Sequence, residues 1–234
     1  MMMTPQVSPA KEPMEKLMKK GIPLLPVFVL IPLLYWLGFS SFGTDMIWKA
    51  FGLGALGWVI ALFLRGPISV IGLKMPKERA QTIIVGSSGP LEEGVRMGLL
   101  LLTSSGFSWA LSLGQGWAAI EVLYTMIQVI AIASLAHRTD DKAMQAKAML
   151  EAQGTVTASP LWGIVERVFA SAFHIGFTLL VARYHWLVIA LIPLHSAVNL
   201  SAVRLAKKSI ALFELTMAVL GTVALVAGIL VFQI

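Results

Sequence analysis

Long apolar runs constrain this chain more than any other feature of its sequence. A helix needs about twenty mainly apolar residues to cross a bilayer, and a spanning segment must satisfy its backbone hydrogen bonds internally. The chain is 57% hydrophobic and 13% charged, with a mean hydropathy of +0.82. We therefore expect an all-α protein, a polytopic transmembrane helical bundle of about seven spans. The predicted spans are residues 21–42, 46–64, 80–104, 107–136, 160–182, 186–205 and 209–232.

The regions outside these runs are too short to form a separate soluble domain. Residues 1–20 are polar and end in basic residues, which predicts a cytoplasmic N-terminal tail. Residues 21–234 are expected to form a single transmembrane helical domain, with its motif-bearing core at 86–204. Between the fourth and fifth spans, the pattern at 143–153 indicates a helix on the membrane surface, with Asp140 as its N-terminal cap.

The charges that flank the spans predict an orientation. Cytoplasmic connections are enriched in Lys and Arg, and in this sequence every second connection is basic. Seven spans with the N-terminus inside and the C-terminus outside fit this pattern. The net charge of +6 is therefore attributed to membrane orientation and anionic lipids, and we expect no nucleic-acid partner. The absence of cysteine excludes disulfides and thiolate metal ligands.

Ionisable residues inside the apolar runs are the candidates for function, because a charge at bilayer depth is costly and usually functional. A rise of about 1.5 Å per residue places them in one layer near mid-bilayer, although they come from four spans. Glu92 and Arg96 are four residues apart, as are His195 and Asn199, so each pair shares a helix face. The candidate catalytic residues are Glu92, Glu93, Arg96, Glu121, His174, His195 and Asn199.

These residue types suit hydrolysis. A carboxylate takes a proton from water, a histidine orients that water or protonates the leaving group, and an Asn amide stabilises the oxyanion. Arg96, next to Glu92, is expected to keep that carboxylate ionised. Alternatively, Glu92, His174 and His195 are an adequate ligand set for Zn²⁺ with an open position for water.

Each candidate also has a structural interpretation. Glu92 with Arg96 can be a buried salt bridge, and Glu121 can be the partner of a buried arginine. Glu166 and Arg167 can pair with other helices, and Glu214 is expected at the membrane interface.

The order of the motifs resembles a known superfamily. EEGVR at 92–96, ERVFASAFH at 166–174 and HSAVN at 195–199 resemble the CAAX prenyl protease and bacteriocin-processing superfamily of intramembrane proteases. The compact EEGVR and the GQGWAAIE segment at 114–121 are most similar to its YhfC-type branch of intramembrane metalloproteases. The resemblance implies that Glu92 activates water, that Arg96 supports it, that His174 and His195 bind the water or a metal, and that Asn199 stabilises the oxyanion.

We therefore predict an intramembrane endopeptidase of a bacterial-type plasma membrane, acting on a transmembrane or lipidated peptide. Two alternatives remain. The same buried Glu, His and Arg residues can relay protons in a proton-coupled transporter or channel. The chain can also be a membrane scaffold or immunity protein whose site has lost activity.

Overall fold

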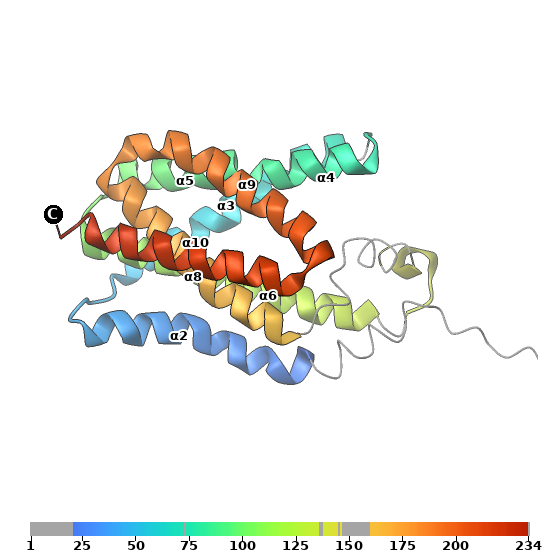
Figure 1. Cartoon of the computed structure of the whole chain (residues 1–234), viewed down its shortest axis with the longest axis horizontal. Helices are drawn as coiled ribbons and strands as arrows, with labels where there is room; N and C mark the ends of the chain where they lie inside the picture. The colour runs from blue at the N-terminus through green and yellow to red at the C-terminus, as the bar shows by residue number, and fades with distance from the viewer. Residues whose placement is uncertain (1–20, 73, 136–137, 145, 147–159, 234) are drawn as a thin grey trace, which may run out of the picture.

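The computed structural model describes residues 21–72, 74–135, 138–144, 146 and 160–233, and all regular elements among them are helices (Figure 1). Six helical stretches are long and apolar enough to cross a membrane, which confirms the all-α class and an integral membrane protein. The helices are η1 (Ile22–Leu24), α2 (Leu25–Ser41), α3 (Trp48–Gly72), α4 (Lys77–Gly86), α5 (Ser88–Leu102), α6 (Phe107–Leu135), α8 (Pro160–Arg183), η2 (His185–Leu187), α9 (Val188–Lys208) and α10 (Ile210–Leu230).

Two predicted segments lie wholly or largely outside the described residues. The N-terminal tail, 1–20, is one of them, and most of the surface helix predicted at 143–153 is the other. Residues 141–144 are helical, and a side-chain oxygen of Asp140 accepts a hydrogen bond from the backbone N–H of Ala143 at 3.4 Å, as expected of the predicted cap. Asp140 also pairs with the Arg138 guanidinium, which lowers the pKa of the Asp140 carboxyl.

The third predicted span, 80–104, is divided at Ser87 into α4 and α5. α5 has 15 residues and is not one of the six long apolar stretches. Pro90 has no N–H to donate to the carbonyl of Gly86, which would leave that group without a partner inside the bundle. The Ser196 hydroxyl of α9 supplies the missing bond, donating to the Gly86 oxygen at 2.7 Å. The break in the helix thus becomes a contact between α4–α5 and α9.

α8 is the central helix of the bundle. In its most apolar window 61% of the residues are buried, against 28% or less in the other five long stretches. It packs most extensively against α10 and α6, while α2 lies along the outside of the bundle (Figure 1). A side chain on α8 can therefore contact side chains from several helices at the same time.

Glycines allow this packing to be close. At Gly176 of α8, an added Cβ would overlap the backbone of Ala224 in α10, and at Gly221 of α10 it would overlap the Phe169 carbonyl. α3 and α6 approach in the same way at Gly54 and Gly116. Because helix association in lipid depends on close backbone approach, these positions fix the spacing of the helices that carry the site.

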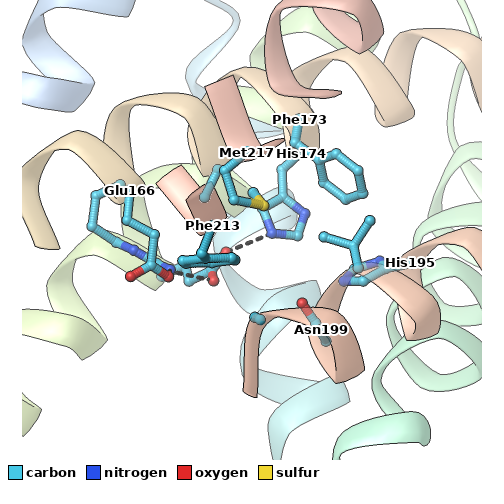
Figure 2. Close-up of a pocket in the computed structure, with 12 residues that line it drawn as sticks. Glu166, Phe173, His174, His195, Asn199, Phe213 and Met217 are labelled. Carbon is cyan, nitrogen blue, oxygen red and sulfur yellow. Dashed lines mark hydrogen bonds and ion pairs between the residues drawn. The ribbon is translucent and has the colours of Figure 1, made fainter. Parts of the chain in front are cut away.

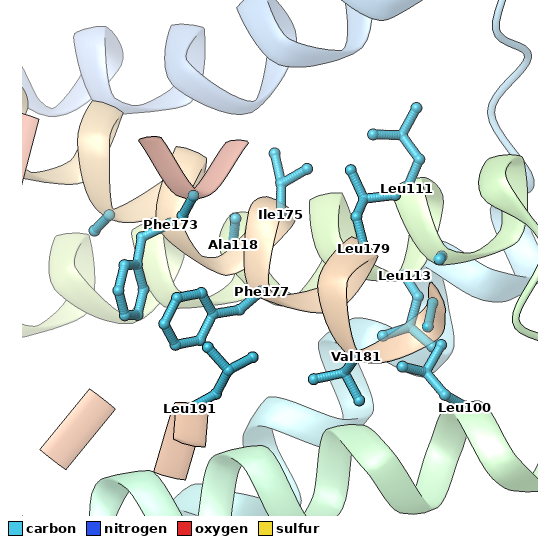
Figure 3. Close-up of a cluster of buried hydrophobic side chains, with 14 of the residues drawn as sticks. Leu100, Leu111, Leu113, Ala118, Phe173, Ile175, Phe177, Leu179, Val181 and Leu191 are labelled. Carbon is cyan, nitrogen blue, oxygen red and sulfur yellow. The ribbon is translucent and has the colours of Figure 1, made fainter. Parts of the chain in front are cut away.

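An apolar layer fills the bundle beyond His174, toward the C-terminal end of α8 (Figure 3). Phe173, Phe177 and Val181 project from α8 and are at most 2% exposed. They pack in one buried cluster with residues of the neighbouring helices, including Leu100, Leu113 and Leu191. The polar residues of the bundle therefore have a dry boundary on this side.

We predict that Gly176→Ala destabilises the protein by about 1–3 kcal/mol, because the new methyl group meets the α10 backbone rather than a flexible side chain. Thermal unfolding of the purified protein in detergent measures this. Gly52→Ala is the matched control, since nothing lies within 4 Å of its added Cβ, and it is expected to be neutral or slightly stabilising. Equal melting temperatures for the two variants would contradict the close packing of α8 and α10.

Candidate active site

The seven residues predicted from the sequence lie in one polar cluster inside the bundle. α5 contributes Glu92, Glu93 and Arg96, α6 contributes Glu121, α8 contributes His174, and α9 contributes His195 and Asn199. Five of them, Glu92, Glu93, Arg96, His174 and His195, are at most 4% exposed. Because an unpaired polar group is costly at such depth, the hydrogen bonds of the cluster define how each member can act.

Arg96 links two parts of the cluster. One terminal nitrogen pairs with the Glu93 carboxylate, and the other lies 3.0 Å from Nδ1 of His174. The guanidinium also lies over the Trp117 ring, 4.4 Å from its centroid. Because arginine stays protonated, it is the donor, and Nδ1 of His174 must accept. The ring proton of His174 is then on Nε2, which lies 2.6 Å from a Glu121 carboxylate oxygen and donates to it.

His195 has the opposite arrangement. Its Nδ1 lies 2.7 Å from Glu93 and donates to that carboxylate. Its Nε2 faces a Glu92 oxygen across 3.8 Å, which is too far for a direct hydrogen bond. A carboxylate that accepts from one ring nitrogen fixes the tautomer and the ring orientation, so His195 presents Nε2 to the gap beside Glu92.

Glu92 is held by a residue that the sequence interpretation assigned to a connection. The second span was predicted to end at residue 64, but α3 continues to Gly72, and Arg65 forms an ion pair with Glu92 from within that helix. Trp117 donates from its indole N–H to the other Glu92 oxygen at 3.3 Å. Arg65 was missed because an arginine followed by Gly66 and Pro67 resembles the end of a span.

Arg96 therefore does not support Glu92 as expected. With Arg65 on Glu92, the pair within α5 is Glu93 with Arg96, three residues apart. The carboxylate that faces His195 Nε2 across a gap is Glu92, whereas Glu93 already holds His195 and Arg96. This geometry favours Glu92 over Glu93 as the group that activates water.

A second arginine extends the cluster along α8. One terminal nitrogen of Arg167 donates to Glu121 at 2.7 Å, and the other pairs with Glu166. Glu121 therefore bridges Arg167 and His174. It is the partner of a buried arginine, as its structural interpretation predicts, and it also contacts the candidate site through His174.

The orientation of Asn199 is set by Ser88. The Ser88 hydroxyl donates to the Val85 carbonyl at 2.7 Å, so it can only accept from Asn199, whose amide nitrogen lies 2.8 Å away. The amide oxygen lies on the side of the two histidines (Figure 2). The predicted oxyanion role of Asn199 needs an N–H directed into the cavity, whereas this orientation presents an acceptor.

A small cavity borders four residues of the cluster, Glu121, His174, His195 and Asn199 (Figure 2). Glu92, Glu93 and Arg96 lie behind this wall and are not part of the lining. Its volume is about 40 Å³, enough for about three water molecules. Polar and apolar side chains share its wall, with Phe213 and Met217 of α10 covering the side opposite His195. The lining residues are Glu121, Glu166, Arg167, Ala170, Phe173, His174, His195, Val198, Asn199, Ala202, Phe213 and Met217.

Glu92, His174 and His195 match a metal site in kind and spacing. Each offers one ligand atom, and the three atoms lie within 4.8 Å of one another. His195 and Glu92 fit best, because Glu93 and Arg65 each hold the side of the group that faces away from the gap. His174 fits less well, since Arg96 occupies its lone pair and Glu121 its N–H, so it must exchange a partner before it can bind a cation.

Comparison of the chain with protein-family models, with curated proteins and with solved structures found no match.

We predict that Arg96→Met costs about 3–5 kcal/mol of stability, because it leaves the fully buried Glu93 without its cationic partner. Thermal unfolding measures the loss. Arg204→Met, at an exposed position on α9, is the control and is expected to change stability by about 0.5 kcal/mol or less. The double variant Glu93→Gln with Arg96→Met should recover part of the loss. Additive effects of the two changes would show that the pair is not coupled.

Proposed function

We propose that this protein is an intramembrane endopeptidase that hydrolyses a peptide bond with a water molecule activated by Glu92. The observation that supports this best is the gap of 3.8 Å between Glu92 Oε2 and His195 Nε2. A water molecule next to both atoms can donate one hydrogen bond to each, which leaves its lone pairs directed toward a substrate carbonyl.

The proposed steps follow from these contacts. Glu92 takes a proton from the water molecule while the oxygen of that water forms a bond to the carbonyl carbon of the substrate. The carbon–nitrogen bond then breaks, and Glu92 returns the proton to the amine that leaves. Arg65 holds the carboxylate in place between these steps. Asn199 accepts a hydrogen bond from the N–H of the scissile peptide through its amide oxygen.

The family proposal rests on the motif order described above: we place the chain with the YhfC-type branch of the CAAX prenyl protease and bacteriocin-processing superfamily. In a metal-dependent form of the reaction, Glu92, His174 and His195 would hold a Zn²⁺ ion. Such an ion would supply Lewis-acid chemistry to the substrate carbonyl and to the attacking water. His174 can join this set only when Arg96 or Glu121 releases one of its ring nitrogens.

We also propose seven spans, with α4–α5 as the third, the N-terminus inside and the C-terminus outside. The contacts between helices support alternating directions. Phe169 lies at Gly221 and Gly176 at Ala224, so α8 and α10 run in parallel. α5 and α9 run antiparallel, with Gly86 near Leu200 and Gly89 at Ile192. In this topology the proposed substrate is a transmembrane or lipidated peptide that enters from a bacterial-type plasma membrane.

We predict that Glu92→Gln lowers the cleavage rate about 10²–10⁴-fold while the protein stays folded, because the amide cannot take a proton from water. The assay follows fluorogenic transmembrane peptides with purified protein in lipid nanodiscs, with and without a chelator. Loss of activity with chelator, restored by zinc, would favour the metal-dependent form. Arg204→Gln is the matched control, because this exposed residue lies outside the cluster.

Two results would contradict the proposal. One is cleavage that survives Glu92→Gln. The other is pH-dependent flux in proteoliposomes without any cleavage, which would favour the transporter or channel alternative.

We predict that Ser88→Ala lowers the cleavage rate about five- to tenfold with little effect on folding, because Asn199 loses the contact that fixes its amide. Ser171→Ala is the matched control. This serine is also buried, but its hydroxyl bonds only to the Arg167 carbonyl of its own helix, so the rate is expected to stay close to the wild-type value. Equal rates in the two variants would show that Ser88 does not position Asn199.

A further inference from the structure

Glu214 is a buried acid that the proposed reaction does not use. The sequence predicts it at the membrane interface, and in the structure neighbouring side chains leave it only 3% exposed. It lies on α10 between Phe213 and Leu215, and Phe213 is part of the cavity wall. Its Oε2 atom is buried without a hydrogen-bond partner. A buried polar atom of this kind needs an explanation, because an ionised carboxylate in such a position loses its solvation without compensation.

The charges around Glu214 do not provide that compensation. Glu166 and Arg167 of α8 line the same cavity as Phe213 and Met217, which flank Glu214 on α10. Both terminal nitrogens of Arg167 are already engaged, one by Glu121 and one by Glu166. Arg167 thus already pairs with two carboxylates of this region, Glu121 and Glu166, before Glu214 is considered. Like charges in one site favour the protonation of one member.

α9 also packs on α10, and among its described side chains the Lys and Arg residues, Arg204 and Lys208, are exposed. α9 faces the same cavity with His195, whose Nδ1 is committed to Glu93. Of the three carboxyl groups, Glu121 has contacts with both Arg167 and His174, and Glu166 has one with Arg167. Of the three, Glu214 is the one with a buried oxygen that has no hydrogen-bond partner.

We propose that Glu214 is a proton-binding site, which holds a proton at neutral pH next to the Glu166 carboxylate. Glu214 is the fifth residue of α10 and Glu166 the seventh of α8, so the site lies near the ends of both helices, where it can exchange protons with the aqueous phase. When Glu214 releases its proton, the Nε–H of Arg167, which has no partner, is available to the new carboxylate.

This assignment does not depend on the proposed peptidase activity. Arg167 connects Glu166 with Glu121, and Glu121 contacts His174, so a continuous chain of polar contacts leads from this region to the candidate active site. In a hydrolase, the proton on Glu214 can be passed along these contacts to the active site. In a transporter, the same proton can be coupled to substrate transport. The test therefore uses a readout that needs no substrate.

Infrared difference spectroscopy on the protein in lipid nanodiscs tests the proposal. A protonated carboxylic acid has a carbonyl-stretch band above the amide I region, and this band shifts in D₂O. At neutral pH, the wild-type spectrum minus that of Glu214→Gln is expected to contain this band. Glu78→Gln, at an exposed acid of α4, is the matched control and should remove no such band.

Glu166→Gln distinguishes a proton site from a merely buried side chain. This variant keeps Glu214 but removes the neighbouring negative charge, so the Glu214 band is expected to be weaker than in the wild type at the same pH. Glu214→Gln should also keep the wild-type melting temperature, because an amide resembles a protonated carboxyl in shape and charge. No band lost in Glu214→Gln, or a Glu166→Gln band as strong as the wild type, would overturn the proposal.

Discussion

The structure depends on the pairing of charges inside an apolar bundle. Arg96 connects Glu93 of its own helix with His174 of α8, and no part of its side chain is exposed to solvent. Separating such a group from its partners would leave uncompensated charge at bilayer depth, which costs several kcal/mol. The same contacts determine which ring nitrogens of the histidines carry protons. The same ion pairs and hydrogen bonds therefore stabilise the bundle and set the protonation pattern of the site histidines.

Much of the fold and of the site could be predicted from the sequence. Hydropathy located the helices, and the spacing of EEGVR and HSAVN identified residues that meet in one cluster. The partners of those residues were harder to predict. Arg65 was missed because its helix continues past Gly66 and Pro67, and Glu92 was paired with Arg96 because spacing within one helix says nothing about a competing arginine from another.

Burial by neighbouring helices was also missed where a charge lies near the end of a helix. Glu214 is five residues into α10, which suggested an interfacial position, and the packing of α8 and α9 on α10 leaves it only 3% exposed. Burial of this kind depends on which helix lies next to which, and that follows from close glycine contacts such as Gly221 against Phe169. The division of the third span at Ser87 likewise depended on Ser196, which lies more than a hundred residues away in the sequence.

The hydroxyl of Ser196 on the Gly86 carbonyl has a mechanical consequence. Ser196 is adjacent to His195, and Pro90, which leaves the Gly86 carbonyl free, is only two residues before Glu92. The Ser196–Gly86, His195–Glu93 and Asn199–Ser88 hydrogen bonds thus join α9 to α4–α5 at three points. α5 and α9 should therefore move as one rigid unit. An opening wide enough to admit a peptide segment then requires that other helices are displaced.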